Sequence, residues 1–238
     1  MIRCEAIRRS FGDQEVLKGI DFEFEKGKTN LIIGRSGAGK TVLLKILVGL
    51  VVPTSGKVWY DTTEFGSLSK QALQELRMNI GMLFQGNALF DSLTIEQNIR
   101  FPMDMFTNFT AKQKRAQVDS CLERVSLEGV HKKYPSEISG GMQKRVGIAR
   151  AIVLNPRYLF CDEPNSGLDP QTSITIDELI LSITKDKQIT TVINTHDMNS
   201  VMEIGEKICL LDKGLVAWQG SKDEVLKSQN EELHDFIF

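Results

Sequence analysis

The residues most able to do chemistry stand in one short glycine-rich run that fits G-x-x-x-x-G-K-[ST] at every fixed position. In such a loop, successive backbone N–H groups close around phosphate oxygens, and the following helix N-terminus adds partial positive charge. Lys40 can reach the β- and γ-phosphates of a nucleotide, and the Thr41 hydroxyl can bind Mg²⁺. We therefore expect a phosphate-binding loop, with a glycine-rich turn that binds nothing as the alternative; its residues are Gly34, Arg35, Ser36, Gly37, Ala38, Gly39, Lys40 and Thr41.

Two adjacent carboxylates supply a second chemical group. Asp162 and Glu163 end the apolar run Tyr158-Leu-Phe-Cys. Asp162 is placed to hold a metal ion, usually through water, and Glu163 to orient or deprotonate an attacking water. A strand that ends in two acids is common by itself, but after a phosphate loop it indicates hydrolysis of a bound nucleotide.

A third segment lies between these two. The run Ser139-Gly140-Gly141-Met142-Gln143 precedes a stretch in which apolar residues repeat at helical spacing. A serine hydroxyl, glycine amides and a helix N-terminus suit a second phosphate site. The same residues also suit an ordinary helix start, and both interpretations stand.

The elements that must position these groups fall into three parts. Ile20, Phe22 and Phe24 alternate with acidic residues, as in a half-buried strand that a turn at 12–14 joins to an earlier strand near 2–7. Short apolar runs then recur and alternate with helical stretches, which indicates parallel strands covered on both faces. The runs lie at 30–33, 80–84, 157–161, 189–194 and 207–211.

The middle of the chain reads differently, because it contains helix starts and no comparable strand. Capping-box patterns begin at Thr94 and Thr110, and another begins at Ser221. We therefore expect an α/β fold: a mainly parallel core over about 1–86 and 155–225, with an N-terminal antiparallel β subdomain, an inserted helical subdomain over about 87–154, and a short C-terminal helix or tail over about 221–238.

Composition sets further limits. The 238 residues are 41% hydrophobic and 25% charged, with a net charge of −2, which is typical of a globular protein and disfavours nucleic acid as a partner. The start has no apolar signal-peptide segment, and no run approaches the roughly 20 residues that span a bilayer. The four cysteines are far apart among apolar neighbours, so we expect buried reduced thiols in a cytosolic protein.

Taken together, these motifs and their order resemble the ATP-binding cassette (ABC) ATPases over essentially the whole chain, as a single domain of residues 1–238. The resemblance implies ATP and Mg²⁺ as cofactors and hydrolysis of ATP to ADP and phosphate. It places Glu163 and His196 in catalysis, and Thr41, Gln85 and Asp162 around the metal. Without it, Gln85 reads as a solvated strand-end residue and His196 as structural.

The resemblance also implies how the nucleotide is enclosed. Phe11 matches the aromatic residue that stacks on adenine, with Val16 beside it, although Phe11 alone reads as a core residue next to a turn. Ser139, Gly140, Gly141, Met142 and Gln143 would close in trans over the nucleotide of a partner, and Asp169 would signal between the two halves. The resemblance therefore implies that the chain forms a homodimer or pairs with another cassette. Met142 stands where the family usually has Gln, which changes details of closure.

A single cassette without long insertions resembles a transporter subunit. Residues of about 81–106 lie where the family grips a permease, although a packed subdomain core explains their apolar character equally well. Asn87-Ala-Leu-Phe-Asp-Ser-Leu-Thr94, the phosphate loop and Ser-Gly-Gly-Met resemble the Mla-type ATPases, which drive phospholipid trafficking with MCE-type lipid-binding proteins. Asn165-Ser166-Gly167 departs from that subgroup.

The resemblance therefore implies phospholipid transport by a subunit on the cytoplasmic face of the inner (cell) membrane. The alternatives are a cassette for another small solute, a regulatory ABC clamp on a protein client, and a P-loop kinase, which leaves the Ser-Gly-Gly segment unexplained. The tail 231–238 can pack on a neighbour or fray.

Overall fold

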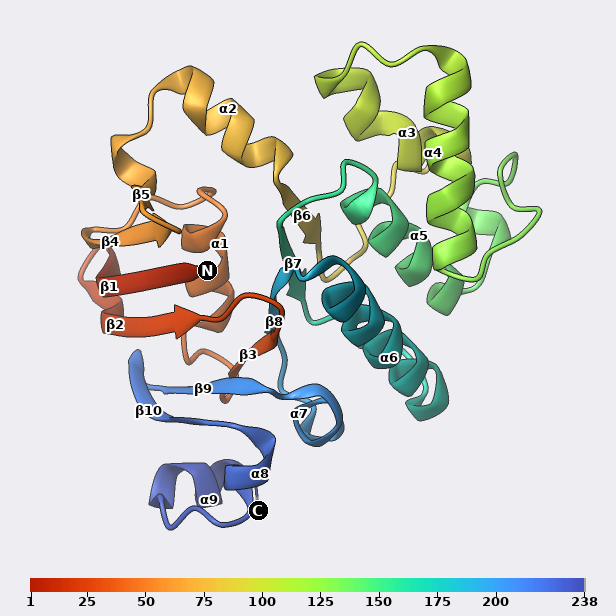
Figure 1. Cartoon of the computed structure of the whole chain (residues 1–238). Coiled ribbons are helices and arrows are strands. Elements are labelled where there is room, and N and C mark those ends of the chain that lie inside the picture. The colour runs from red at the N-terminus through yellow and green to blue at the C-terminus, as the bar shows by residue number, and fades with distance from the viewer. Residues whose placement is uncertain (238) are drawn as a thin grey trace.

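The computed structural model describes residues 1–237, and two sheets form its framework (Figure 1). The smaller sheet has the order β2-β1-β4-β5 and the larger one the order β10-β9-β3-β8-β7-β6. In Figure 1 the smaller sheet stands on the side opposite helices α3, α4 and α5, with the larger sheet between them. The chain thus passes back and forth between the smaller and the larger sheet before it reaches helices α3, α4 and α5.

The smaller sheet is antiparallel throughout and begins at the N-terminus. It contains β1 (Ile2–Phe11), β2 (Gln14–Phe24), β4 (Ser55–Tyr60) and β5 (Thr63–Glu64). The alternation of apolar and acidic residues predicted a half-buried strand, and in β2 the side chains of Ile20, Phe22 and Phe24 are buried while the acidic residues between them are exposed. This layer covers one face of the larger sheet.

The larger sheet contains the strands that end at the predicted chemical groups. Its members are β3 (Thr29–Ile33), β6 (Ile80–Leu83), β7 (Tyr158–Asp162), β8 (Thr190–Asn194), β9 (Lys207–Asp212) and β10 (Leu215–Gly220). The five strands β9, β3, β8, β7 and β6 are parallel, and β10 joins β9 as an antiparallel edge. Their carboxyl ends therefore meet at one edge of the sheet.

Two hydrophobic cores fill the two sides of this sheet, because successive side chains of a strand point to opposite faces. Leu31 and Ile33 of β3 face the helical side, where they join Leu159 and Cys161. Ile32 faces the other core, with the antiparallel layer and helix α1. This two-sided burial explains why the strand is apolar at every position except its first two.

Helices flank the sheets, and several begin where the sequence marks a cap. Thr94 and Thr110 form complete capping boxes before α3 (Ile95–Phe106) and α4 (Ala111–Arg124). Ser221 does the same before the short α8. The remaining helices are α1 (Lys40–Leu47), α2 (Lys70–Met78), α5 (Gly140–Ile152), α6 (Pro170–Lys187), α7 (Met198–Ile204), α8 (Lys222–Val225) and α9 (Glu231–Ile237), with 3-10 turns at 65–67 and 135–137.

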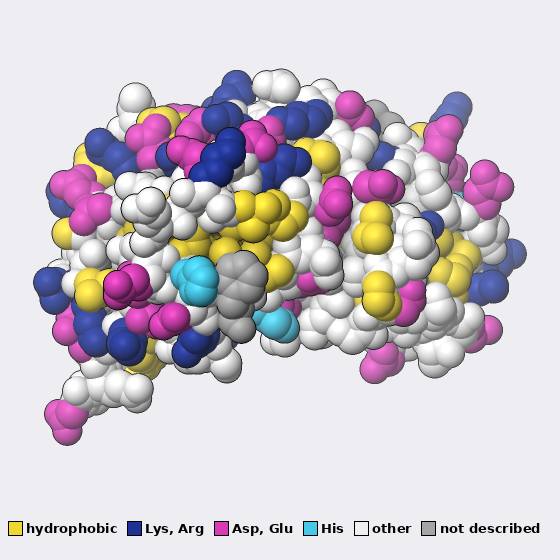
Figure 2. Space-filling view, turned by 90° about the horizontal axis from the view of Figure 1, so that it is seen from below, with side chains coloured by type: hydrophobic (Ala, Val, Ile, Leu, Met, Phe, Trp, Pro, Cys, Tyr) yellow, Lys and Arg dark blue, Asp and Glu magenta, His cyan; other side chains and the backbone are white. Residues whose placement is uncertain are grey.

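The expected mixed α/β fold, with its antiparallel N-terminal sheet and parallel-rich second sheet, is confirmed. The exact division into core, helical insert and tail stays a prediction, and the last residue of the predicted tail, Phe238, lies outside the described residues. Within residues 1–237, no helix has the length and apolarity needed to cross a membrane. On the face shown in Figure 2, acidic and basic side chains are interspersed.

Candidate functional site

The phosphate loop connects β3 to α1 in a shape that needs its glycines. Gly34 has φ +144°, and a Cβ there would lie 2.2 Å from the backbone oxygen of Leu211. Gly39 has φ +104°, and a Cβ there would lie 2.7 Å from Leu17 Cδ2. The backbone oxygen of Leu211 excludes a larger residue at Gly34, and the positive φ disfavours one at both positions. The loop is thus set by the core beneath it.

Lys40 is the first residue of α1, at the end of this loop, and is only 8% exposed. Its Nζ donates hydrogen bonds to the backbone oxygens of Gly34 at 2.7 Å and Arg35 at 3.2 Å. Burial lowers the pKa of this ammonium group, and the nearby carboxylates Glu163 and Asp162 oppose the shift. The cation is therefore held at the mouth of the loop, where a phosphate oxygen can pair with it.

Three oxygen- and nitrogen-bearing side chains meet beside the lysine. Thr41 Oγ1 and Asp162 Oδ1 lie 3.5 Å apart. Asn194 Nδ2 donates a hydrogen bond to Thr41 Oγ1 at 3.1 Å and a second one to Asp162 Oδ1. Asn194 Oδ1 is buried without a hydrogen-bond partner. Hydroxyl and carboxylate oxygens are ligands that Mg²⁺ accepts, mostly together with water and phosphate oxygens. This donor set fits the expected magnesium ion.

Glu163 begins a tight turn directly after β7. Its φ is +51°, which is uncommon for a residue with a side chain, and its N–H donates to the backbone oxygen of Asn194 at 2.9 Å. His196 Nδ1 lies 2.9 Å from Glu163 Oε1 and 2.8 Å from Oε2. The two strand ends thus hold the carboxylate and the imidazole together at the mouth of the site.

A buried lysine links two of the predicted residues through their backbones. Lys144 of α5 is 2% exposed, and its Nζ donates to the backbone oxygens of Gln85 at 2.8 Å and Glu163 at 3.4 Å. Burial lowers the pKa of Lys144. The sequence motif contains this residue, but its spacing alone gave it no role, because its two partners come from distant turns.

A cavity of about 690 Å³ joins most of these groups, a size within the range of about 300–1,000 Å³ usual for ligand sites. Val16 is one of the residues that line it. Phe11, in contrast, is not among the residues that line the cavity, and its side chain is 47% exposed. Its ring stacks on Arg9, whose guanidinium carbon lies 4.4 Å from the ring centre. The described lining residues are Val16, Gly34, Arg35, Ser36, Gly37, Gly39, Lys40, Thr41, Val42, Gln85, Glu163, His196 and Phe236.

One wall of this cavity comes from the far end of the chain, which sequence reasoning missed. Arg35 Nη2 donates to the backbone oxygen of Asp235 at 2.6 Å, and Phe236 of α9 lines the cavity. In Figure 1, α9 lies with α8 beyond β10, at the end of the larger sheet. The predicted tail therefore packs on its own phosphate loop.

The Ser-Gly-Gly segment lies apart from the phosphate loop of the same chain. Ser139 is the N-cap of α5, and its Oγ accepts a hydrogen bond from the N–H of Met142 at 3.3 Å. Gln143 Nε2 is turned away, donating to the backbone oxygen of Pro135 at 3.0 Å. A separate cavity of about 340 Å³ is lined by Ser139, Gly140, Gly141, Met142, Arg145, Gly167, Leu168, Asp169 and Thr172.

Asp169 faces this second cavity as the N-cap of α6. Its Oδ1 accepts from the N–H of Thr172 at 3.0 Å, and its Oδ2 from the Thr172 hydroxyl at 2.6 Å. These hydrogen bonds, the hydroxyl first, lower the pKa of Asp169. The carboxylate thus stays ionised beside the exposed end of α5.

Sequence comparison assigns the family. Residues 17–166 match the model described as ABC transporter. The chain is 42% identical over 228 residues to a methionine import ATP-binding protein MetN of Carboxydothermus hydrogenoformans, covering 94% of this chain and 67% of the relative. It is 35% identical over 236 residues to the probable ribonucleotide transport ATP-binding protein mkl of Mycobacterium leprae, covering 99% and 68%. The chain spans about two thirds of these relatives.

Structural comparison agrees. A dimeric post-hydrolysis structure of the ATP-binding cassette MJ0796, bound to ADP and Pi, matches with a TM-score of 0.84 at 30% identity, covering 93% of this chain and 99% of that one. The cbiO1 protein of Clostridium perfringens, part of the transporter complex cbiONQ, matches with a TM-score of 0.87 at 30% identity, covering 96% and 91%. The two sequence relatives are named for methionine and for ribonucleotide transport, so they lend the phospholipid expectation no support.

The family, the fold and the site agree on the chemistry. The cofactors are ATP and Mg²⁺, and hydrolysis of ATP is coupled to transport. The chain belongs to the ABC transporter family, as its ATP-hydrolysing nucleotide-binding domain.

Proposed function

We propose that this chain drives the import of a small polar solute, with an amino acid as the first candidate, by pairing with a second cassette and a membrane permease. The similarity to a methionine import ATPase, at 42% identity over 94% of the chain, is the observation that carries this proposal. It favours the small-solute alternative over phospholipid trafficking.

In this proposal the phosphate loop and its neighbours bind the nucleotide. Lys40 and the loop amides hold the phosphates, and Val16 borders the nucleotide on the side of the antiparallel sheet. Thr41, Asp162 and Gln85 hold Mg²⁺, with Asn194 keeping the first two in place. When bound, the ion neutralises charge that develops on the phosphates.

Glu163 is the proposed base for hydrolysis. Its carboxylate orients the attacking water and takes a proton from it, while His196 holds the carboxylate and faces the terminal phosphate. The hydrogen bonds from Lys144 to the backbones of Gln85 and Glu163 fix the distance between the metal side and the water side of the site. Lys144 is thus proposed as a positioning residue.

Pairing of two cassettes would complete each site. Ser139 and Gly141 stand at an exposed helix start that does not line the phosphate cavity of its own chain. A partner related by a two-fold axis would place this helix start over the phosphates, with Asp169 beside the contact. We propose a homodimer, with another cassette as the alternative partner.

A second surface suits the permease. A groove of about 410 Å³ is lined mainly by residues of the segment of about 81–106 that the sequence singles out, and α5 contributes to another wall through Arg150 and Ala151. Phe84, Phe90 and Met105 are exposed large apolar side chains in this groove. A helix from a membrane protein could insert an apolar face there. The chain would then be peripheral on the cytoplasmic face of the cell membrane.

Purification of the tagged chain from gently solubilised membranes, followed by identification of its partners, tests the proposal. A permease together with a solute-binding protein is the expected result. Recovery of a permease with an MCE-type protein would instead establish phospholipid trafficking, which the segment Asn87–Thr94 still motivates. A chain recovered without any membrane partner would overturn transport and favour the regulatory clamp.

A further inference from the structure

A separate cavity of about 250 Å³ lies at the sheet edge opposite the phosphate loop. The loop follows the carboxyl end of β3, whereas this cavity contacts Tyr158 and Thr190, the first residues of the parallel strands β7 and β8. Its inner wall is apolar, formed by the buried side chains Cys121, Ile152, Ile183 and Ile189. The cavity therefore takes no part in binding ATP.

Positive charge is concentrated among the residues that line it. The described lining contains no acidic residue, and it includes five cationic groups: the Met1 amine, Lys26, Arg124, Arg157 and Lys187.

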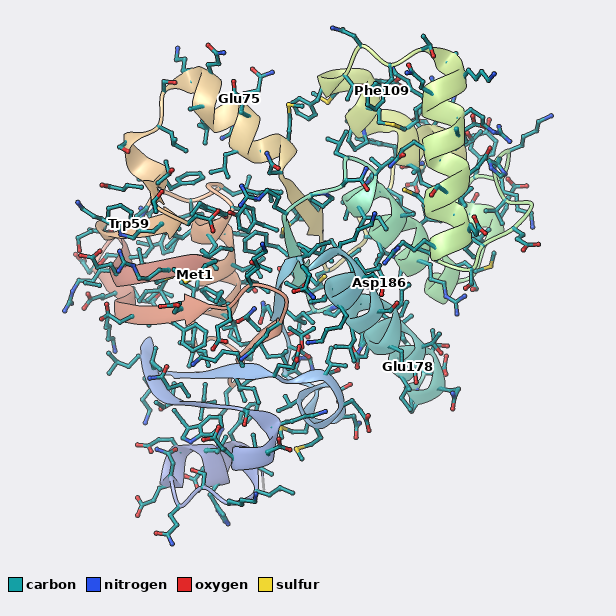
Figure 3. The ribbon with its side chains drawn as sticks, in the orientation of Figure 1. Met1, Trp59, Glu75, Phe109, Glu178 and Asp186 are labelled. Carbon is teal, nitrogen blue, oxygen red and sulfur yellow. The ribbon has the colours of Figure 1, made fainter. Side chains whose placement is uncertain are left out.

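Carboxylates just outside the cavity neutralise only part of this charge. Asp61 accepts from the Met1 amine at 2.9 Å and from Arg157 at 2.7 Å. Asp186, labelled on α6 in Figure 3, accepts from Arg124 of α4 at 2.9 Å. Within residues 1–237, Lys26 and Lys187 have no ion pair.

Two buried polar atoms in the lining also lack partners. The Thr190 side chain is 1% exposed, and its Oγ1 makes no hydrogen bond. Arg124 Nε is likewise buried and unpartnered. A buried polar group without a partner costs roughly 1–3 kcal/mol, so native structures normally supply one. Both residues line the cavity, so a bound anion would offer acceptor oxygens next to these donors.

We propose that this cavity binds a small organic anion: a carboxylate or phosphate group held by the cations and the Thr190 hydroxyl, on a short apolar body that packs against the buried wall. The volume falls below the roughly 300–1,000 Å³ of sites for drug-sized ligands, which indicates a small ligand. Because α4 supplies one side of the cavity and α6 with β8 the other, the anion joins the helical part to the core.

Calorimetric titration of the full chain with octanoate tests the proposal, with inorganic phosphate and octanamide as comparison probes. Octanoate should bind, and both other probes should bind at least about 5-fold more weakly, since each lacks one of the two features that the cavity recognises. Equal binding of octanamide would show that the charge plays no part. If phosphate bound as tightly as octanoate, the apolar wall would play no part in binding. Either result, or no binding of octanoate, overturns the proposal.

Variants locate the binding. Lys26→Gln and Lys187→Gln should each weaken octanoate binding by up to about 5-fold, and the double variant by more. Thr190→Val keeps the shape of the side chain and removes the hydroxyl, so it should also weaken binding. Lys112→Gln is the matched control, because Lys112 is exposed at the far end of α4. Equal affinity of the control and the double variant would refute this location.

A chemical readout covers the case in which a variant folds poorly. Burial raises the pKa of the Cys121 thiol to about 11, with Arg124 and Lys187 opposing the shift, so the thiol should react slowly with iodoacetamide. Octanoate in the cavity of the unmodified chain should slow alkylation of Cys121 further, as measured by mass spectrometry. Unchanged alkylation under saturating octanoate would place the ligand elsewhere and overturn the proposal.

Discussion

Asp177 of α6 is a buried carboxyl whose ionisation should set part of the stability of the protein. It is 3% exposed, and Ser200 Oγ donates to its Oδ2 at 2.7 Å, while its Oδ1 has no partner. Burial raises its pKa to about 6; Ser200 and Asn165 oppose the shift, and the nearby charges of Asp197 and Glu203 add to it. The folded protein therefore prefers the neutral form of this group.

The size and sign of the effect follow from the change in pKa on folding. The shift from 3.8 to about 6 means that ionisation costs the folded state about 3 kcal/mol. Because the folded state holds the proton more tightly, stability falls as the pH rises through this range, and the loss is complete above about pH 7. Between about pH 5 and about pH 7.5, about 1.4 kcal/mol should be lost.

Urea unfolding of the wild type and of Asp177→Asn at these two pH values measures the effect. The amide stays neutral and keeps an oxygen for Ser200, so the variant should lack this loss and gain stability over the wild type as the pH rises. Asp91→Asn, an exposed carboxyl, is the control and should follow the wild type. Identical pH dependence in the wild type and Asp177→Asn would refute the reasoning.

Three further substitutions test the ATP site. Lys40→Ala should weaken ATP binding by about 10²-fold or more, because a charged hydrogen-bond donor is lost, and an unchanged Kd by calorimetry would contradict the phosphate-loop assignment. Glu163→Gln should keep ATP binding, lower turnover by about 10²-fold or more and trap an ATP-bound dimer visible by gel filtration; hydrolysis at the wild-type rate would mean that another group is the base. Lys144→Met should lower the free energy of unfolding in urea by about 2 kcal/mol, since two carbonyls lose their donor, and should lower kcat with little change in the Kd of ATP. If kcat stays constant in a less stable Lys144→Met protein, the lysine is only structural.

The sequence predicted those features that depend on local spacing. The capping residues Thr94 and Thr110 begin their helices, and the alternation around Phe22 forms a half-buried strand, because both signals act within a few residues. The segment from Gly34 to Thr41 follows a strand and leads into a helix, as its apolar flanks indicate, because these signals are local as well.

The parts that the sequence did not predict depend on contacts between distant segments. Asn194 bridges Thr41 and Asp162 only because β8 lies between β3 and β7 in the sheet, an order that no local pattern encodes. The wall formed by Phe236 likewise depends on where α9 packs. The sequence suggested Phe11 as a site residue, but in the structure Phe11 stacks on Arg9 and is not among the residues that line the cavity.

The position of β3 in the sheet has a consequence for how the protein is made. Its two neighbours, β8 and β9, begin at residues 190 and 207, so the strand that carries the phosphate loop has no partner until β8 has left the ribosome. At roughly 5–20 residues per second, the synthesis of the residues between β3 and β8 takes roughly 8–31 seconds. The contact between Arg35 and Asp235 spans 200 residues and forms later still. Nascent chains therefore expose the apolar strand β3 throughout this interval, and their ATP site is complete only after β8 and the contact between Arg35 and Asp235 have formed.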